Sequence, residues 1–216
     1  VWALPRFGTF NVHAALLPQY RGAAPINWAI INGETMTGVT TFFLDHDIDT
    51  GRIIKQREFP IPDDADVEYV YDGLMRLGAQ IAKDTVDMVR EHDGHVPSIP
   101  QGESESLNNA PKIFRETCEI DWTKPAKQVY DFVRGLSPIP GAWTMVRLSE
   151  SGDPQMMKIY KTAKTGEACD AVPGTLRAGK KNLYIAAADC WLEIIEIQMT
   201  GKKRMAARDF VNGLKK

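Results

Sequence analysis

The 216-residue chain has an ordinary globular composition, with 44% hydrophobic and 25% charged residues and a formal net charge of −2. No apolar run approaches the roughly 18 residues of a membrane-spanning helix, which argues against a membrane protein. The three cysteines form no Cys-x-x-Cys pair and the four histidines are scattered, so neither a disulfide framework nor a zinc site is expected. We therefore expect free thiols in a reducing cytoplasm and no bound metal.

The near-neutral total hides a difference between the two halves of the chain. Residues 1–110 carry 8 basic and 16 acidic side chains (net −8), whereas residues 111–216 carry 18 and 12 (net +6). An acidic first half and a basic second half favour two structural units, with the basic unit facing a polyanion.

The first predicted elements surround a group of polar residues near the start of the chain. Residues 8–12 are typical of a short strand, and Asn11 and His13 are two positions apart, so they point to the same side. Pro25 suits the first turn of a following helix. Two polar side chains thus stand at a strand end beside a helix start, which is where α/β folds bind ligands.

The next elements form a hairpin and a long helix. Residues 38–45 and 52–61 are rich in strand-forming residues, and the polar loop of residues 45–51 carries three aspartates and ends in glycine. Long loop tips often carry function rather than packing. An acidic cap at residues 63–66 then begins an amphipathic helix, whose apolar residues recur at three- and four-residue spacing as far as Val89.

The second half begins with a polar, proline- and glycine-containing stretch, residues 93–111, which is typical of a linker. A short helix follows, with Thr123 as its predicted N-cap, and residues 206–211 predict a helical tail. Between these helices we expect five short strands, a number typical of a small barrel: residues 142–148, 155–162, 174–178, 182–187 and 191–199. The apolar phase changes within the last strand, which predicts a bulge near Ile194 and Ile195.

Residues 11–25, Asn-Val-His-Ala-Ala-Leu-Leu-Pro-Gln-Tyr-Arg-Gly-Ala-Ala-Pro, resemble the signature of the folate-dependent formyltransferases. The family pattern has serine where this chain has Ala15, a change that removes one hydroxyl contact and leaves the Asn–His pair intact. Further motifs resemble the second domain of the members that act on methionyl-tRNA: Ala-Pro-Lys at 110–112, Ile-Asp-Trp at 120–122, Arg-Gly-Leu-Ser-Pro at 134–138, Pro-Gly-Ala-Trp at 140–143 and the stretch 201–210. The resemblance covers essentially the whole chain.

This resemblance implies an α/β protein: the C-terminal part of a Rossmann-like formyltransferase domain (residues 1–92), the linker (93–111), and a small β-barrel similar to an oligonucleotide-binding fold (112–216). The chain starts at valine rather than methionine, and only about ten residues precede the signature, so we expect an N-terminal segment to be absent. The implied reaction transfers a formyl group from 10-formyltetrahydrofolate to the amino group of methionyl initiator tRNA, in a monomer without metal.

Moving a formyl group onto an amine requires donors to the oxygen of the tetrahedral intermediate and a group that manages the proton of the amine. Asn11 and His13 can both donate to that oxygen. A carboxylate close to His13 would favour its imidazolium form and could relay the proton. The loop offers Asp45, Asp47 and Asp49, and the residues alone leave the choice open. The Asp-Thr-Gly pattern of the family selects Asp49.

The resemblance also implies two binding surfaces. Leu16, Leu17 and Pro18 would form the wall for the folate ring system, and Asp45 and Asp47 would shape the folate side of the loop. The same three apolar residues could instead belong to the ordinary core. Contacts to tRNA are assigned to five cations: Arg21, Lys202, Lys203, Arg204 and Arg208. Arg21 could equally form a surface salt bridge.

Other interpretations remain open at this stage. A sugar-nucleotide N-formyltransferase or a formyltetrahydrofolate hydrolase would share the Asn, His and Asp residues, although the basic second half counts against both. A chain without its N-terminal segment could also bind tRNA without catalysing transfer.

Overall fold

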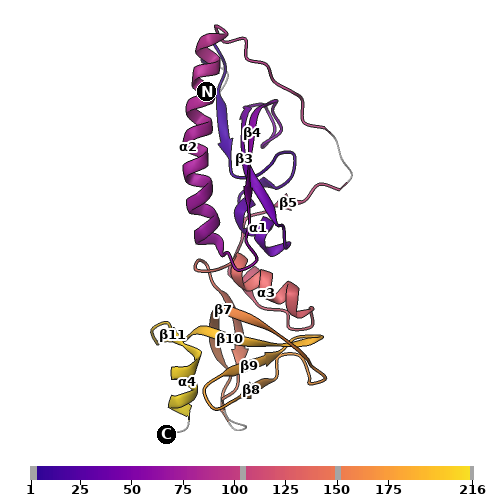
Figure 1. Ribbon diagram of the computed structural model, residues 1–216, viewed down its shortest axis with the longest axis vertical. Coiled ribbons are helices and arrows are strands. Elements are labelled where there is room, and N and C mark those ends of the chain that lie inside the picture. Colours follow the sequence, from indigo (N-terminus) through magenta and orange to yellow (C-terminus); the bar gives the residue numbers. More distant parts are fainter. Residues whose placement is uncertain (1–3, 103–105, 149–151, 215–216) are drawn as a thin grey trace. The chain divides into compact units, whose positions relative to one another are not determined.

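The computed structural model describes residues 4–102, 106–148 and 152–214, which divide into two compact units (Figure 1). The first unit comprises residues 1–30 and 34–113, and the second comprises residues 31–33 and 114–216. None of the helices in the described ranges combines the length and the apolar character that crossing a membrane requires.

The first unit is built on a three-stranded antiparallel sheet with the order β1-β3-β4. Its strands are β1 (Phe10–His13), β3 (Met36–Phe43) and β4 (Ile53–Pro60). The predicted hairpin of two strands joined by a long acidic loop is therefore confirmed. Asn11 lies opposite Phe42 and His13 lies opposite Thr40, so the sheet register places the two polar residues beside the second half of β3.

A long helix, α2 (Val67–Glu91), packs against one face of this sheet, as predicted. The helix begins at the expected acidic cap, because the side chain of Asp66 accepts a hydrogen bond from a backbone N–H of the first turn. Farther along, Asp84 lies 2.9 Å from Lys55 Nζ and 2.6 Å from Arg57 Nη2, and both cations belong to β4. The hydrogen bond from Lys55 holds the pKa of the Asp84 carboxyl below its ordinary value.

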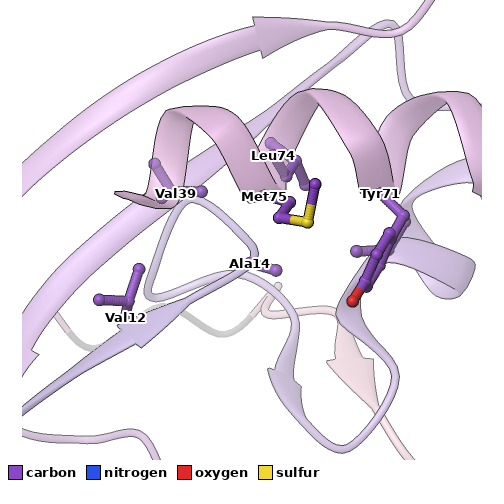
Figure 2. A pocket seen from close by; sticks show the side chains of 8 residues that line it. Val12, Ala14, Val39, Tyr71, Leu74 and Met75 are labelled. Carbon is purple, nitrogen blue, oxygen red and sulfur yellow. The ribbon is translucent and has the colours of Figure 1, made fainter. Parts of the chain in front are cut away.

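The side of β1 that faces α2 borders an apolar groove of about 310 Å³ (Figure 2). The groove also borders α1 (Pro25–Ile31), which begins at the predicted proline. Its lining residues are Val12, Ala14, Ile26, Val39, Tyr71, Leu74, Met75 and Gly78. Alternate residues of a strand point to opposite faces, so Asn11 and His13 point away from this groove. The candidate site therefore lies on the face of the sheet opposite α2.

The stretch predicted as a linker is bonded to the first unit. In that stretch β5 (Asn109–Ala110) pairs in parallel with β2 (Arg21–Gly22). Ile99 and Ile53 exchange two backbone hydrogen bonds of 2.8 and 2.9 Å. The backbone after α2 thus returns along the loops that carry the candidate site.

In its described residues the second unit contains a short 3-10 helix, two α-helices and six strands, and all five predicted strands are present. These elements are η1 (Glu116–Cys118), α3 (Ala126–Gly135), β6 (Ala142–Val146), β7 (Gln155–Ala168), β8 (Leu176–Ala178), β9 (Leu183–Ala186), β10 (Cys190–Met199), β11 (Met205–Ala206) and α4 (Ala207–Leu214). Figure 1 shows β7 and β10 as the long central strands of this unit.

The pairing of these strands does not show the closed barrel that the sequence analysis predicted. The antiparallel sheet follows the order β6-β7-β10-β9-β8, and β11 adds to β10. A closed barrel requires the two end strands of this path to bond to each other, and the described strands β6 and β8 do not. The second unit is therefore an open sheet in its described residues.

Two local expectations for this unit had different outcomes. The register between β10 and β7 shifts between Ile194 and Glu196, so the predicted bulge is confirmed. The expected N-cap of the short helix was wrong, because α3 begins at Ala126 rather than beside Thr123. The carboxylate of Asp189 accepts the Ala126 N–H at 2.7 Å and supplies the cap from 63 residues along the chain.

Candidate active site

His13 lies at the end of β1 and is only 7% exposed. Its Nε2 atom is 2.9 Å from the carbonyl oxygen of Tyr20, and its Nδ1 atom is 3.7 Å from Oδ2 of Asp49. The ring also meets Phe42 edge to face, with a centroid separation of 6.4 Å. A carbonyl, a carboxylate and an aromatic ring thus fix the orientation of the imidazole.

The Tyr20 carbonyl determines which nitrogen of the His13 ring carries the proton when the ring is neutral. A carbonyl oxygen only accepts hydrogen bonds, so Nε2 must hold the hydrogen. Nδ1 then faces Asp49 as a lone pair in the neutral ring and as an N–H donor in the protonated ring. The additional proton of a protonated His13 ring would therefore be on Nδ1, beside the carboxylate.

Asp49 belongs to the loop between β3 and β4 and adopts a φ of +56°, in the left-handed region that residues other than glycine rarely occupy. Its side chain is 13% exposed. Oδ2, the same oxygen that faces His13, accepts the backbone N–H of Gly22 at 3.0 Å. The carboxylate is therefore held between the ring of His13 and the backbone of β2.

Asp45 and Asp47 lie on the exposed part of this loop. Asp45 Oδ1 accepts the backbone N–H of His46 at 2.7 Å, and Asp47 Oδ1 lies 3.3 Å from His46 Nδ1. The side chains of His46 and Asp47 are 93% and 81% exposed. Of the three aspartates in the loop, Asp49 is the one that the structure brings to His13.

Asn11 presents its amide on the same face of β1 as His13, and the residue is exposed. Its Oδ1 atom accepts the backbone N–H of Val12 at 2.9 Å. Because this contact uses the amide oxygen, the NH₂ group remains available to donate to a bound molecule.

A network of hydrogen bonds around the buried Thr40 anchors the loop that follows β1. Thr40 Oγ1 donates to the carbonyl of Ala15 at 2.6 Å and accepts the N–H of Leu17 at 3.1 Å. Gln56 Nε2 donates to the Leu17 carbonyl at 2.8 Å and to Thr40 Oγ1 at 3.0 Å. The hydroxyl of Thr40 is on β3, so the loop is fixed to the centre of the sheet.

The three predicted wall residues differ in their surroundings. Leu17 is 3% exposed and packs against Phe42 and Ile53, so it belongs to the core beneath the site. Leu16 and Pro18 are half-buried. These two therefore keep surface that a bound molecule could cover.

Arg21 and Asp49 share one polar partner, the amide of Gln101. Arg21 donates to Gln101 Oε1 from Nε at 3.0 Å and from Nη2 at 2.7 Å. Gln101 Nε2 in turn donates to the carbonyls of Asp49 and Gly51 at 2.8 and 2.7 Å. The sequence assigned Gln101 to a linker, whereas the structure places it beside the candidate site.

Two of the cations assigned to tRNA already have acidic neighbours within the second unit. Arg204 donates from Nε and Nη2 to the two carboxylate oxygens of Glu196, at 2.6 and 2.7 Å, and its guanidinium lies 4.2 Å from the ring centroid of Tyr160. Arg208 Nε is 3.7 Å from Asp209 Oδ1. Arg204 thus has a structural role, because it joins β10 to the segment before β11.

Lys202 and Lys203 have different surroundings. Both are exposed, and in the described part of the second unit neither forms an ion pair. Exposed lysines without an acidic partner are suited to contacts with phosphate. In the described ranges, no three His, Cys, Asp or Glu side chains gather as metal ligands.

Family models match both units of the chain. Residues 1–86 match the model described as formyl transferase, and residues 112–215 match the formyl transferase C-terminal domain. The methionyl-tRNA formyltransferase of Parabacteroides distasonis is 52% identical over 220 residues, which covers 100% of this chain and 67% of that protein. The chain belongs to the formyltransferase family.

A second relative of this formyltransferase chain, the methionyl-tRNA formyltransferase of Flavobacterium johnsoniae, is 42% identical, and the match covers 99% of this chain and 67% of that protein. The chain thus spans about two thirds of the length of these curated relatives.

Two solved structures share the fold at low sequence identity. HypX from Aquifex aeolicus, in complex with tetrahydrofolic acid, has a TM-score of 0.69 at 21% identity and covers 96% of this chain and 35% of its own. The N-formyltransferase from Helicobacter canadensis, in complex with folinic acid and dTDP-3-aminofucose, has a TM-score of 0.66 at 20% identity and covers 91% and 66%. The α/β formyltransferase fold is therefore established for this chain.

Sequence reasoning missed three groups around the site of this formyltransferase chain: the carbonyl of Tyr20, the hydroxyl of Thr40 and the amide of Gln101. A backbone carbonyl carries no residue-specific signal. Threonine in a strand is expected for its β-propensity alone. Gln101 stands in a stretch of polar residues, prolines and glycine that is typical of linkers, so its role depends on a return of the backbone that no local pattern predicts.

Proposed function

We propose that this chain carries the catalytic residues for transfer of a formyl group from 10-formyltetrahydrofolate to the amino group of methionyl initiator tRNA. The observation that carries the proposal is the buried His13 ring, held with Nδ1 at 3.7 Å from the Asp49 carboxylate. The methionyl-tRNA formyltransferases that match the whole chain support the choice of acceptor.

Each of the three residues has a role that its contacts support. The NH₂ group of Asn11 and the Nδ1–H of the protonated His13 ring donate to the oxygen of the formyl group as it becomes an oxyanion. Asp49 stabilises the protonated His13 ring and receives the proton that leaves the attacking amine. As the new C–N bond forms, the bond between the formyl carbon and N10 of the folate breaks, and the leaving N10 takes up that proton. Tyr20 keeps Nε2 occupied, so the ring cannot turn away from the reacting atoms.

The residues present fit a folate formyl donor. Leu16 and Pro18 offer half-buried apolar surface near His13 in sequence, and Leu17 packs in the core beneath them. Asp45 and Asp47 lie on the exposed part of the acidic loop. Solved relatives of this fold contain tetrahydrofolic acid or folinic acid, which supports a folate as the donor. These five residues make up the proposed folate side of the site.

A formylation assay tests the proposed function. Charged initiator tRNA and 10-formyltetrahydrofolate would be mixed with this chain, and with a form extended at its N-terminus to the length of its relatives. Formyl-methionyl-tRNA is expected with the extended form. Formylation of a dTDP-amino sugar instead, or release of formate without an acceptor, would identify one of the other two reactions and refute the proposal.

We further propose that Lys202 and Lys203 contact the tRNA backbone, with Arg21 and Arg208 adding charge. The double variant Lys202→Glu/Lys203→Glu is expected to weaken tRNA binding and to reduce the slope of log K against log salt by about one to two, since each lost phosphate contact removes nearly one released counterion. Filter binding or fluorescence anisotropy at several salt concentrations measures this slope.

The control for this experiment makes the same change in net charge on the first unit. Lys83 and Arg90 are 77% and 78% exposed on α2, and Lys83→Glu/Arg90→Glu should leave the slope nearly unchanged. Arg204→Ala should mainly lower stability, because that side chain is bound to Glu196 and Tyr160. An unaltered slope in the double lysine variant would contradict the assignment of these two residues.

A further inference from the structure

The side chain of Gln101 uses both ends of its amide to join segments that are distant in sequence. Its NH₂ group donates to the carbonyls of Asp49 and Gly51, which lie 52 and 50 residues earlier. Its oxygen accepts two hydrogen bonds from the guanidinium of Arg21, which lies 80 residues earlier. One half-buried amide therefore connects the loop of the proposed catalytic carboxylate with a proposed tRNA-binding cation.

Asp49 depends on such support because the tip of its loop is exposed. Within the loop the Thr50 hydroxyl donates to the Asp47 carbonyl at 3.1 Å, but that bond does not reach the carbonyl of Asp49. The side chains of residues 45–48 are exposed, so packing does not fix this part of the loop. Asp49 itself has a φ of +56°, a conformation that costs a residue with a Cβ about 1 kcal/mol. Gln101 donates to the carbonyls of Asp49 and Gly51, which lie on either side of Thr50, and these hydrogen bonds fix the backbone of the turn. The carboxylate then reaches both the His13 ring and the N–H of Gly22.

We propose that Gln101 is a positioning residue that holds the Asp49 carboxylate beside His13 and, with the other end of its amide, orients Arg21. The inference rests on the proposed function, because it assumes that Asp49 takes part in formyl transfer. Gln101 acts through Asp49 and Arg21 and does not itself touch the reacting atoms. Its two ends serve different steps: the NH₂ group serves catalysis and the oxygen serves tRNA binding.

Because the two ends act separately, two variants divide their effects. Gln101→Glu keeps an oxygen for Arg21 but replaces the NH₂ group with a second oxygen that faces two carbonyls. It is expected to lower kcat by about 10- to 100-fold, in line with the cost of displacing a catalytic group by about 1 Å. Because the new carboxylate also forms an ion pair with Arg21, the KM for tRNA is expected to rise several-fold. Arg21→Met is expected to raise the KM for tRNA to a similar extent with kcat nearly unchanged, so that the loss of kcat is specific to the NH₂ end of Gln101.

The matched control is a glutamine that makes a similar contact elsewhere in the first unit. Gln80 Oε1 accepts from Arg57 Nη1 at 3.3 Å. Arg57 contacts Asp84 of α2, so this contact lies on the face of the sheet opposite His13. Gln80→Ala should change neither kcat nor KM. A loss of kcat in Gln80→Ala equal to that in Gln101→Glu would overturn the inference, because it would show that any such contact has this effect.

A second readout reports the position of Asp49 without any activity. The Gly22 N–H donates to Asp49 Oδ2, so its proton resonance should lie downfield and exchange slowly with solvent in ¹⁵N-labelled protein. In Gln101→Glu the Gly22 resonance should move upfield, and the amide proton should exchange at least about tenfold faster. Gln101→Met serves the same purpose if Gln101→Glu does not fold. A Gly22 resonance that is unchanged in the folded variants would overturn the inference.

The two readouts separate failure of the inference from failure of the proposed function. If the parent enzyme forms no formyl-methionyl-tRNA but the Gly22 resonance responds to Gln101→Glu, the proposed function is wrong and the positioning role stands. If the parent enzyme is active and Gln101→Glu retains both its kcat and the Gly22 resonance, the inference is wrong and the proposed function stands.

Discussion

His13→Gln and Asp49→Asn are each expected to lower kcat/KM for formyl transfer by about 10²- to 10⁴-fold, the range for removing a general acid–base group or an oxyanion donor. His13→Gln removes the proton exchange at Nδ1, and Asp49→Asn removes the charge that stabilises the protonated ring. Steady-state kinetics with charged initiator tRNA in the extended chain measures the effect. Binding of tRNA should be nearly unchanged, since both side chains are largely buried.

These two substitutions are chosen because they preserve the structural contacts. The amide of glutamine can donate to the Tyr20 carbonyl in place of His13 Nε2, and the amide oxygen of asparagine can accept the Gly22 N–H in place of Asp49 Oδ2. The double variant should be little worse than either single variant, because residues that act as a unit have strongly non-additive effects.

The control for this pair is another histidine with an acidic neighbour. His46 lies 3.3 Å from Asp47, but its side chain is 93% exposed, so His46→Gln should retain full activity. Turnover at the parent rate in either His13→Gln or Asp49→Asn would contradict the assignment. Fully additive losses in the double variant would show that the two residues do not act together.

Gly51→Ala is expected to lower the free energy of unfolding by about 1–3 kcal/mol and to reduce kcat by about 100-fold. A Cβ at this position would lie 1.7 Å from the carbonyl oxygen of Phe43 and 2.8 Å from its carbonyl carbon. The obstruction is backbone, so no side chain can rotate away and the loop itself must move. Gly51 also offers its carbonyl to Gln101, so the movement would reach Asp49.

Urea denaturation measures the first effect and single-turnover kinetics the second. Gly102→Ala is the control, because a Cβ there meets nothing within 4 Å, and its stability should stay within about 0.5 kcal/mol of the parent. If Gly51→Ala had the stability and the rate of the parent protein, the loop would be far more adaptable than its contacts indicate.

Much of the fold follows from local patterns in the sequence. The apolar spacing of α2, its acidic cap and the strands on either side of the aspartate loop are all encoded within a few residues of where they form. The bulge in β10 is visible as a change of apolar phase, because the strand must turn a different set of side chains to the core. The placement of Asn11 and His13 on one face follows from the two-residue period of a strand.

What the sequence did not predict depends on pairing between distant segments. Asp189 caps α3 from 63 residues away, and Arg204 reaches Glu196 only because β11 pairs with β10. Whether a sheet closes into a barrel depends on the pairing of its end strands, which strand propensity does not specify. The choice of Asp49 among three aspartates came from a family motif, since the aspartates of the loop are chemically identical in sequence.

The bonds from Gln101 and the pairing of β2 with β5 have a consequence for the order in which the protein matures during its synthesis. Gln101 follows Asp49 by 52 residues, which at about 5–20 residues per second leave the ribosome roughly 3–10 seconds later. A nascent chain that ends with α2 contains Asn11, His13 and Asp49 but not the bonds that place Asp49. The Asp49 loop therefore acquires the bonds from Gln101 only late in the synthesis of the first unit, after its sheet and long helix have had time to form.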